Sequence, residues 1–470
     1  MTVLRKAANW GRSCLSTDSL ETDTSYYDLL VSRVRRLRRP RELFVEGLLG
    51  PQRRLLAYVV VAGVVGGLVG AAYIGLLHLF QSALWPTHWD DLPHLFILVG
   101  AGVAVGVLTR LLGNPGDVEL LVNNIHVSGG PQDIRDLRSL IPVSLLCISA
   151  GGAMGPEAPL VQTTGSLGAW LANRWHLQRD EIRVLTITGM AAGFTVLFGA
   201  PLGSAVFALE ILHRRGMEYY EALMPAVLGS LVGYALYVVL TGVGVEPVWR
   251  FPPLGHLEPV DIAWGLACGV AGAIVAILFT YLTRGAQVVF RWLPPVLRPI
   301  IGGAILGGLA FWSPYALTFG EAQINGLAFR KAALIVFVVA AAAKLLGTTV
   351  TLSSGWRGGF IIPMFFIGVA LGRLGHGLIP ETNEVVLMAG LMVAINVGVT
   401  KTPLGSTLVV TEMAGLQLIP MTLIAAVVSL FLTSEVGLIH SQRRREGAFE
   451  EEESATEEPT PVPAAKAATG

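Results

Sequence analysis

The sequence predicts an all-α polytopic membrane protein, built from two related halves that contain broken and re-entrant helices. Hydrophobic residues make up 53% of the 470 residues and charged residues only 14%, whereas soluble domains carry about 25% charged residues. Apolar segments follow one another along the chain, and several are shorter than the roughly 20 residues that a complete span needs. Short apolar segments interrupted by glycine and proline are typical of broken helices, which are stable at membrane depth only when they are buried in protein or line a cavity.

The chain divides into four predicted regions. Residues 1–54 form a basic cytoplasmic tail, and residues 446–470 form an acidic tail, rich in proline and alanine, that is expected to be disordered. The first transmembrane repeat, residues 55–243, contains apolar segments at 55–85, 93–113, 139–150, 184–212 and 217–243. The second repeat, residues 244–445, contains apolar segments at 262–282, 298–312, 332–350, 359–372, 385–399 and 417–439.

Basic residues next to the outermost spans predict the orientation. Arginines are frequent between Arg33 and Arg41, before the first span, and Arg443–Arg445 follow the last one. Because basic residues stay on the cytoplasmic side, both termini are expected in the cytoplasm, with an even number of crossings of the cell membrane.

Composition and motifs exclude several classes of function. The formal net charge of zero argues against an extended nucleic-acid surface. The three cysteines form no CxxC pair, so neither a disulfide framework nor a metal site is expected, and no cofactor is implied. An intramembrane enzyme would need a constellation such as HExxH or paired intramembrane aspartates, and the chain has neither. We therefore do not expect an enzyme.

Two pairs of segments reveal an internal repeat. Gly151, Gly155, Pro159 and Gly168 recur as Gly355, Gly359, Pro363 and Gly372, at a constant offset of 204 residues. The segment 198–210 (FGAPLGSAVFALE) similarly matches 399–412 (VTKTPLGSTLVVTE), at an offset of 202. Glycine-rich membrane helices can resemble one another by composition alone, but two pairs in the same order favour duplication. Duplicated membrane proteins with broken helices are typically transporters, whose sites lie where half-helix ends from both repeats meet.

Glu157 is the main difference between the two copies, because Ile361 stands at the matching position. A carboxylate at the bilayer centre costs about 2.5–3.5 kcal/mol, so it is not expected there without a role. Helix N-termini present free N–H groups and partial positive charge, which suit an anion. A carboxylate among such amides would mimic the anion and compete with it, which predicts that Glu157 is a gate. The alternative is a packing carboxylate paired with another donor.

The same motifs resemble those of the CLC family of chloride channels and chloride/proton exchangers, over roughly residues 55–445. The segment 128–131 (SGGP) is similar to the family's GSGxP loop, 155–159 (GPEAP) to its gating-glutamate motif, and 359–363 (GFIIP) to its GxFxP motif. The resemblance implies an inverted repeat of the CLC type, a homodimer and one anion pathway per subunit. It implies Glu157 as the gate and an anion site formed by Ser128, Gly129, Gly155, Ala158, Phe360, Ile361 and His440. A serine at position 128 favours chloride over nitrate.

Departures from the family pattern decide the expected mechanism. Exchangers of the family carry a second glutamate at the position of Ile211, so stoichiometric proton exchange is in doubt. Glu210 and His213 are neighbours that could replace it, which gives a candidate proton path of Glu157, Glu210 and His213. Pro156 stands where the family has a basic residue. We expect a chloride channel or a loosely coupled transporter; the alternatives are a proton-coupled chloride antiporter and a fluoride-exporting member.

Several residues keep a second interpretation. Ser128 also suits a turn before two glycines, and His440, at the position of the family's inner tyrosine, could be an interfacial histidine. Glu210 and its repeat mate Glu412 are expected to be structural carboxylates that close helix-end hydrogen bonds. Lys344 is expected to snorkel or to pair, and not to bind the anion directly. A cation or amino-acid transporter built on another inverted repeat remains a rival; it would coordinate its substrate with acidic or carbonyl groups.

Overall fold

The computed structural model describes residues 51–85, 91–116, 118–131, 134–213, 219–245, 247–439 and 442. The predictions for most of the basic tail, for the acidic tail and for His440 lie outside these residues. The chain forms two compact units, Met1–Ala57 and Tyr58–Gly470, and the arrangement described below is that of the second unit.

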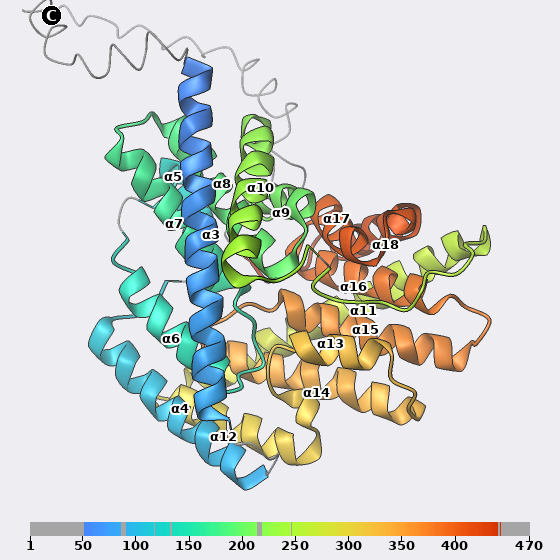
Figure 1. Cartoon of the computed structure of the whole chain (residues 1–470). Coiled ribbons are helices and arrows are strands. Elements are labelled where there is room, and N and C mark those ends of the chain that lie inside the picture. Colours follow the sequence, from blue (N-terminus) through green and yellow to red (C-terminus); the bar gives the residue numbers. More distant parts are fainter. Residues whose placement is uncertain are drawn as a thin grey trace, which may run out of the picture. The chain divides into compact units, whose positions relative to one another are not determined.

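Every regular element in the described part of the chain is a helix, which confirms the all-α prediction (Figure 1). The first half contains α3 (Pro51–Leu84), α4 (Asp91–Leu112), α5 (Val118–Ser128), α6 (Leu137–Ser149), α7 (Glu157–Arg174), α8 (Arg179–Phe198), α9 (Pro201–Glu210) and α10 (Leu223–Thr241). The second half contains α11 (Val260–Arg291), α12 (Leu297–Trp312), α13 (Glu321–Ala328), α14 (Leu334–Ser353), α15 (Ile361–Leu378), α16 (Glu384–Thr400), α17 (Pro403–Ala414) and α18 (Ile419–Leu432).

Seven of the described helices are long and apolar enough to cross a membrane. Four further apolar helices are shorter, at 10 to 17 residues, as expected for broken spans. The chain is therefore a membrane protein. The positions of its termini relative to the membrane stay a prediction, and so do the four region boundaries.

The apolar segment 184–212 is not one helix but two, α8 and α9. Gly199 ends α8 in the left-handed conformation, with φ of 62°, and Pro201 opens α9 at the first helical position, where its missing N–H costs nothing. The second half repeats this break: Lys401 ends α16 with φ of 64°, and Pro403 opens α17. The duplicated proline motif therefore marks a helix start in both halves.

Helices α9 and α17 pack against each other and join the two halves (Figure 1). Their glycines allow the backbones to approach closely. A Cβ on Gly203 would lie 2.5 Å from the Val409 amide nitrogen, and a Cβ on Gly405 would lie 2.5 Å from the Phe207 Cα. Real Cβ atoms do not tolerate such distances, so these glycines are required by the contact, as is usual for membrane helices.

Candidate functional site

A pair of backbone hydrogen bonds joins the two repeat loops. The Gly155 N–H donates to the Gly359 carbonyl at 2.8 Å, and the Gly359 N–H donates to the Gly155 carbonyl at 2.6 Å, which forms an isolated antiparallel bridge. These glycines are repeat mates. Helix α7 begins two residues after the first and α15 two residues after the second, and each helix has 18 residues. The bridge therefore brings the N-termini of two matching helices to one place.

Glu157 lies at this meeting point and is fully buried. It is the first residue of α7, yet its Oε1 accepts a hydrogen bond of 2.5 Å from the Ile362 N–H in the first turn of α15. The first N–H groups of a helix lack partners within the helix and carry partial positive charge, so they stabilise a carboxylate. The carboxylate of one repeat thus occupies the anion-binding end of the helix in the other.

The glycine bridge leaves space for this side chain. A Cβ on Gly359 would lie 2.5 Å from Glu157 Oε2, and one on Gly155 would lie 2.2 Å from the same oxygen. The duplicated glycines therefore have a second use besides the turn: they let the carboxylate rest against the backbone of both loops.

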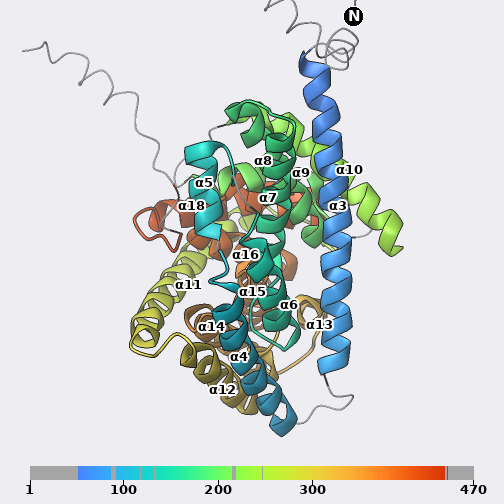
Figure 2. The same cartoon turned by 90° about the vertical axis from the view of Figure 1, so that its left-hand side faces the viewer.

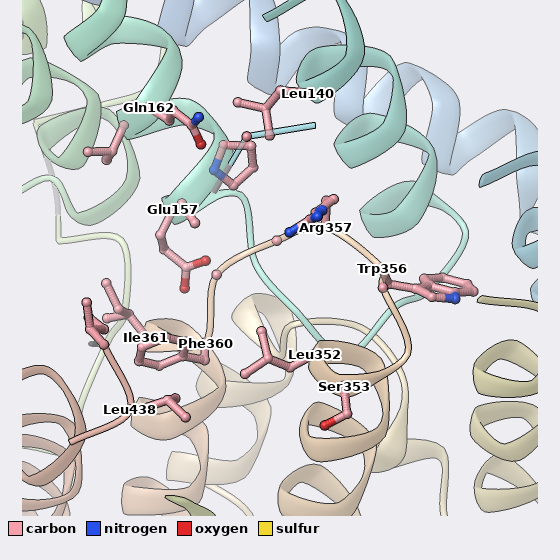
Figure 3. A pocket seen from close by; sticks show the side chains of 18 of the residues that line it. Leu140, Glu157, Gln162, Leu352, Ser353, Trp356, Arg357, Phe360, Ile361 and Leu438 are labelled. Atoms are coloured by element: carbon pink, nitrogen blue, oxygen red, sulfur yellow. The ribbon is translucent and has the colours of Figure 1, made fainter. Parts of the chain in front are cut away.

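Glu157 faces a cavity of about 430 Å³ (Figure 3). The predicted site residues Glu157, Ala158, Phe360 and Ile361 all line it. Its remaining wall contains both polar and apolar residues, and Ile211, Leu438 and Ile439 are among the apolar ones. Ile211, which the sequence analysis singled out for its lack of charge, therefore contributes an apolar surface to the same cavity.

One amide of the site was missed by the sequence analysis. Phe360 and Ile361 were expected to contact the anion, but the N–H that bonds Glu157 belongs to Ile362, the next residue. Phe360 precedes α15 as its N-cap residue, and its carbonyl accepts from the Met364 N–H. The motif predicted a helix start correctly, whereas the identity of the donating amide depends on the side-chain rotamer of Glu157.

Helix α14 holds the loop that leads into Glu157, and the sequence analysis missed this too. Thr348 Oγ1 donates to the Ala153 carbonyl at 3.0 Å. One turn earlier, the fully buried Lys344 donates to the Leu317 and Thr318 carbonyls, both at 2.7 Å. The Thr318 N–H in turn donates to the Gly151 carbonyl at 2.9 Å. Lys344 pairs with carbonyls, as expected. The support by α14 could have been inferred from the sequence, because Lys344 and Thr348 are polar residues one turn apart in an otherwise apolar helix.

Glu210 and Glu412 each accept hydrogen bonds from backbone amides of the opposite helix at the α9–α17 contact. Glu210 accepts from the Leu404 and Gly405 N–H groups at 3.1 and 2.7 Å, and Glu412 accepts from the Gly203 N–H at 2.6 Å. Each carboxylate thus caps the N-terminus of the repeat-related helix. This is the helix-end role expected for the pair, and neither residue lines the cavity at Glu157.

Ser128 and Gly129 do not line that cavity. Ser128 is the last residue of α5, and its Oγ lies at hydrogen-bond distance from the Asn124 and Gly130 carbonyls, at 3.0 and 2.7 Å. Gly129 follows in the left-handed region, with φ of 83°. The geometry is that of the turn-forming serine, so the hydroxyl would have to rotate away from these carbonyls to donate to an anion.

His213 is fully buried beside a second histidine. The rings of His126 and His213 meet edge to face, with centroids 5.2 Å apart. The backbone N–H of His213 donates to the backbone carbonyl of Glu210. His126 Nε2 faces the Leu212 carbonyl at 2.9 Å, and Nδ1 faces the Tyr219 hydroxyl at 2.9 Å. A carbonyl only accepts, so Nε2 carries the proton, and in the neutral ring Nδ1 accepts from the Tyr219 hydroxyl. Of these titratable side chains, His213 lies two residues after Ile211 in sequence.

Gln442, two residues after His440, is the described residue of that C-terminal segment. Its Nε2 donates to the Ile211 and Thr400 carbonyls at 2.9 and 2.8 Å. The side chain therefore links the ends of α9 and α16, and the sequence analysis did not identify it.

Comparison with known proteins gives consistent matches. The family model described as voltage gated chloride channel matches residues 118–434. The chain is 30% identical, over 88% of its length and 91% of the relative's, to a protein of Pseudomonas syringae pv. tomato named chloride/fluoride channel protein. An uncharacterized protein of Methanocaldococcus jannaschii is 24% identical, over 83% of the chain and 96% of that protein.

Solved structures share the fold. A slow cyanobacterial Cl⁻/H⁺ antiporter superposes with a TM-score of 0.71 at 20% identity, over 82% of this chain and 95% of that one. A CLC-type fluoride/proton antiporter also reaches 0.71, at 24% identity, over 83% of this chain and 98% of that one.

Proposed function

Because the chain belongs to the CLC family of anion channels and transporters, we propose that it carries chloride across the cell membrane through the cavity at Glu157, whose carboxylate is the gate. One observation carries the proposal: the fully buried Glu157 carboxylate is bonded to the Ile362 amide, at the N-terminus of α15. This position suits a chloride ion, because helix N-termini bind anions without a full positive charge. Such binding is favourable enough to admit an ion and weak enough to release it.

The proposed gating cycle exchanges one anion for another. While the carboxylate is bonded to the Ile362 amide, it blocks the site that chloride would use. Protonation removes the charge that holds it there, and chloride that arrives from the cavity competes for the same amides. Gly155, Ala158, Phe360 and Ile361 would surround the bound ion from the two loops. Ser128, Gly129 and His440 stay proposed ligands, and Ser128 could donate only after its hydroxyl turns away from the Asn124 and Gly130 carbonyls.

We favour a channel or a loosely coupled transporter. Ile211 gives the cavity an apolar wall, where a second carboxylate would be needed to pass protons on. The main alternative is a proton-coupled chloride antiporter, and the histidine pair is the observation that favours it. The His213 ring contacts the His126 ring, and Glu157, Glu210 and His213 remain the candidate proton path. Fluoride export is the third candidate, since one relative bears fluoride in its name.

The deciding experiment follows chloride efflux and proton uptake together in liposomes that contain the purified protein. We expect chloride efflux with little proton movement. Proton uptake against its gradient, driven by chloride, would replace the channel proposal by the antiporter. Fluoride efflux at least tenfold faster than chloride efflux would assign the fluoride-exporting function.

The gate itself is tested with Glu157→Gln, which keeps the shape of the side chain and removes its charge. We expect efflux to continue and to lose its dependence on pH, because the group that must be protonated is gone. The matched control is Glu381→Gln, at an exposed glutamate outside the cavity. If Glu157→Gln keeps the pH dependence of the wild-type protein, Glu157 is not the gate.

The assembly is proposed to be a homodimer in the cytoplasmic membrane, with both termini in the cytoplasm and one pathway per subunit. Light scattering of the purified protein in detergent measures the mass of the assembly. Single cysteines are introduced near Arg54 and at residue 440 and are labelled in sealed cells with a reagent that does not cross the membrane. The labelling pattern shows on which side of the membrane each terminus lies.

A further inference from the structure

A second, smaller cavity adjoins the cavity at Glu157. Its volume is about 10 Å³, and its lining includes the polar residues Asn124, Asp136, Gln162 and Ser166. This is about the space that one water molecule needs, and a buried water also needs two to four polar partners. Gln162 lines both cavities, so its side chain lies where the two meet.

The two cavities follow one face of α7. Ala158 lines the larger cavity, Gln162 lines both, and Ser166 lines the smaller one. Positions four residues apart lie on the same side of a helix, so these three residues form one stripe. The neighbouring helix α6 follows the same course, because Leu140 lines the larger cavity and Leu137 the smaller one.

Gln162 and Ser166 are buried polar residues whose side chains lack partners in the described part of the chain. Each is only 4% exposed, and neither side chain makes a hydrogen bond to a described residue. Buried polar groups in native proteins are bonded to protein or to ordered water, because an unpaired one is costly. An unpaired amide and hydroxyl at the walls of two cavities therefore indicate that molecules in these cavities are their partners.

The second repeat lacks these polar groups. At the offset of 204, the mates of Gln162 and Ser166 are Phe366 and Ala370, and both are buried. The Phe366 ring instead packs against the Lys344 ammonium, which lies 4.8 Å from the ring centroid. Helices of 18 residues form in both repeats, so the fold itself requires neither an amide nor a hydroxyl at these positions.

The two ends of the Gln162 amide suit the two cavities. Its Nε2 carries two N–H donors and its Oε1 accepts hydrogen bonds. An anion in the larger cavity can accept from Nε2, whereas a water molecule in the smaller cavity can donate to Oε1 and bond to Ser166. Gln162 follows Glu157 by five residues, about 7.5 Å along the helix axis, and both side chains lie at the larger cavity (Figure 3).

We propose that Gln162 is an anion-binding residue that contributes to selectivity, and that a water molecule bound beside Ser166 orients its amide. The proposal rests on anion transport through the cavity at Glu157, as proposed above. A neutral N–H donor holds an ion without a full positive charge and so allows its release. Gln162 thus affects which anion is held and how tightly, whereas Glu157 controls when the path is open.

The test compares Gln162→Met and Ser166→Ala with wild-type protein in liposomes. Methionine keeps the length of the side chain and removes its N–H donors. Initial efflux is measured over a range of concentrations of chloride and of nitrate. We expect Gln162→Met to raise the half-saturating chloride concentration about tenfold, as for loss of a hydrogen bond to a charged group. Ser166→Ala should cause a smaller rise, because the amide remains but its water loses a partner.

Selectivity separates anion contact from a structural role. The ratio of nitrate to chloride efflux should rise in Gln162→Met, because nitrate spreads its charge over three oxygens and depends less on one donor. Gln417→Met is the matched control, at an exposed glutamine outside both cavities, and should leave the ratio and the half-saturating concentration unchanged. If Gln162→Met does not fold, Gln162→Asn, which withdraws the amide by one methylene, should change the same ratio.

Binding is measured without transport by titration calorimetry of the purified protein with chloride. In the Glu157→Gln background the carboxylate no longer competes, and addition of Gln162→Met should weaken chloride binding about tenfold. Unchanged chloride binding and an unchanged nitrate-to-chloride ratio in Gln162→Met would overturn the role of Gln162, even if its thermal stability fell. If Glu157→Gln still removes the pH dependence of efflux in that case, the proposed function stands without Gln162. Wild-type behaviour of Ser166→Ala would refute the orienting water.

Discussion

The Glu157 carboxylate lies where it competes with any anion that approaches the N-terminus of α15. Its Oε1 is bonded to the Ile362 amide, and its Oε2 lies among the glycines of the two loops. Full burial makes the charge costly to hold, so a modest change around the carboxylate should shift it between bonded and released positions. The position of the Glu157 side chain is therefore expected to depend on the space around it as well as on its charge.

Gly359→Ala tests this dependence on space. The new Cβ would meet Glu157 Oε2 at 2.5 Å and the Ala158 amide nitrogen at 2.9 Å, so the carboxylate must leave its position. We expect chloride efflux in liposomes to become less dependent on pH, as for Glu157→Gln. Gly308→Ala in α12 is the matched control: a Cβ there meets nothing within 4 Å, so efflux should not change. Unaltered pH dependence in Gly359→Ala would show that the carboxylate does not rest where the structure places it.

Helix α14 supports the loop before Glu157 through Thr348 and Lys344, neither of which lines the cavity. Thr348 bonds the Ala153 carbonyl directly, and Lys344 reaches the same loop through the segment 317–318. A single rigid helix thus fixes the loop at two points, Gly151 and Ala153. The position of Glu157 at the start of α7 follows from this support as much as from its own motif.

Thr348→Val should loosen that support by removal of one buried hydrogen bond. The Ala153 carbonyl would lose its donor, so we expect a loss of about 1–3 kcal/mol, seen as a lower midpoint of thermal unfolding in detergent. Thr241→Val is the control, because its hydroxyl is exposed and bonds within its own helix; a change within about 0.5 kcal/mol is expected there. Equal midpoints for the two variants would contradict the anchoring role of α14.

At the scale of the whole molecule, the two repeats hold each other's helix ends. Glu210 of the first repeat caps α17, Glu412 of the second caps α9, and Gly203 and Gly405 bring these helices together. At this contact, the N-terminus of the helix in each half is capped by a glutamate of the other half. The halves should therefore unfold together, even though the sequence repeat divides the chain into two.

Glu210→Gln and Glu412→Gln test this coupling. Each should lower the free energy of unfolding by about 1–3 kcal/mol, because charge-assisted hydrogen bonds are weakened. The loss should appear as a lower midpoint of one shared unfolding transition. Differential scanning fluorimetry, with tryptophans of both halves as the reporters, measures the effect against the exposed control Glu381→Gln. Two separate transitions, with only one of them shifted by each variant, would mean that the repeats fold independently.

Much of this fold follows from the sequence because membrane burial leaves strong signals. Apolar segments and duplicated glycines predicted most of the helices, whereas the break before Pro201, inside the apolar segment 184–212, was not predicted. Helices α7 and α17 lie outside the apolar segments read from the sequence, since threonine, serine and glutamate within them interrupt the apolar pattern. The pairing of Glu157 with Ile362, and the support from Thr348, depend on contacts between segments about 200 residues apart. A single sequence does not contain that information.

The bridge between Gly155 and Gly359 has an electrostatic consequence. Two matching residues that exchange both backbone hydrogen bonds lie on the axis that relates the two halves. If both halves still had the same sequence, an acidic residue at position 157 would face an identical acidic residue at position 361 across that axis. Two buried carboxylates so close would repel each other and could not both be ionised. Glu157 in one copy and Ile361 in the other avoid this repulsion, so the symmetric scaffold holds a single buried carboxylate where its two loops meet.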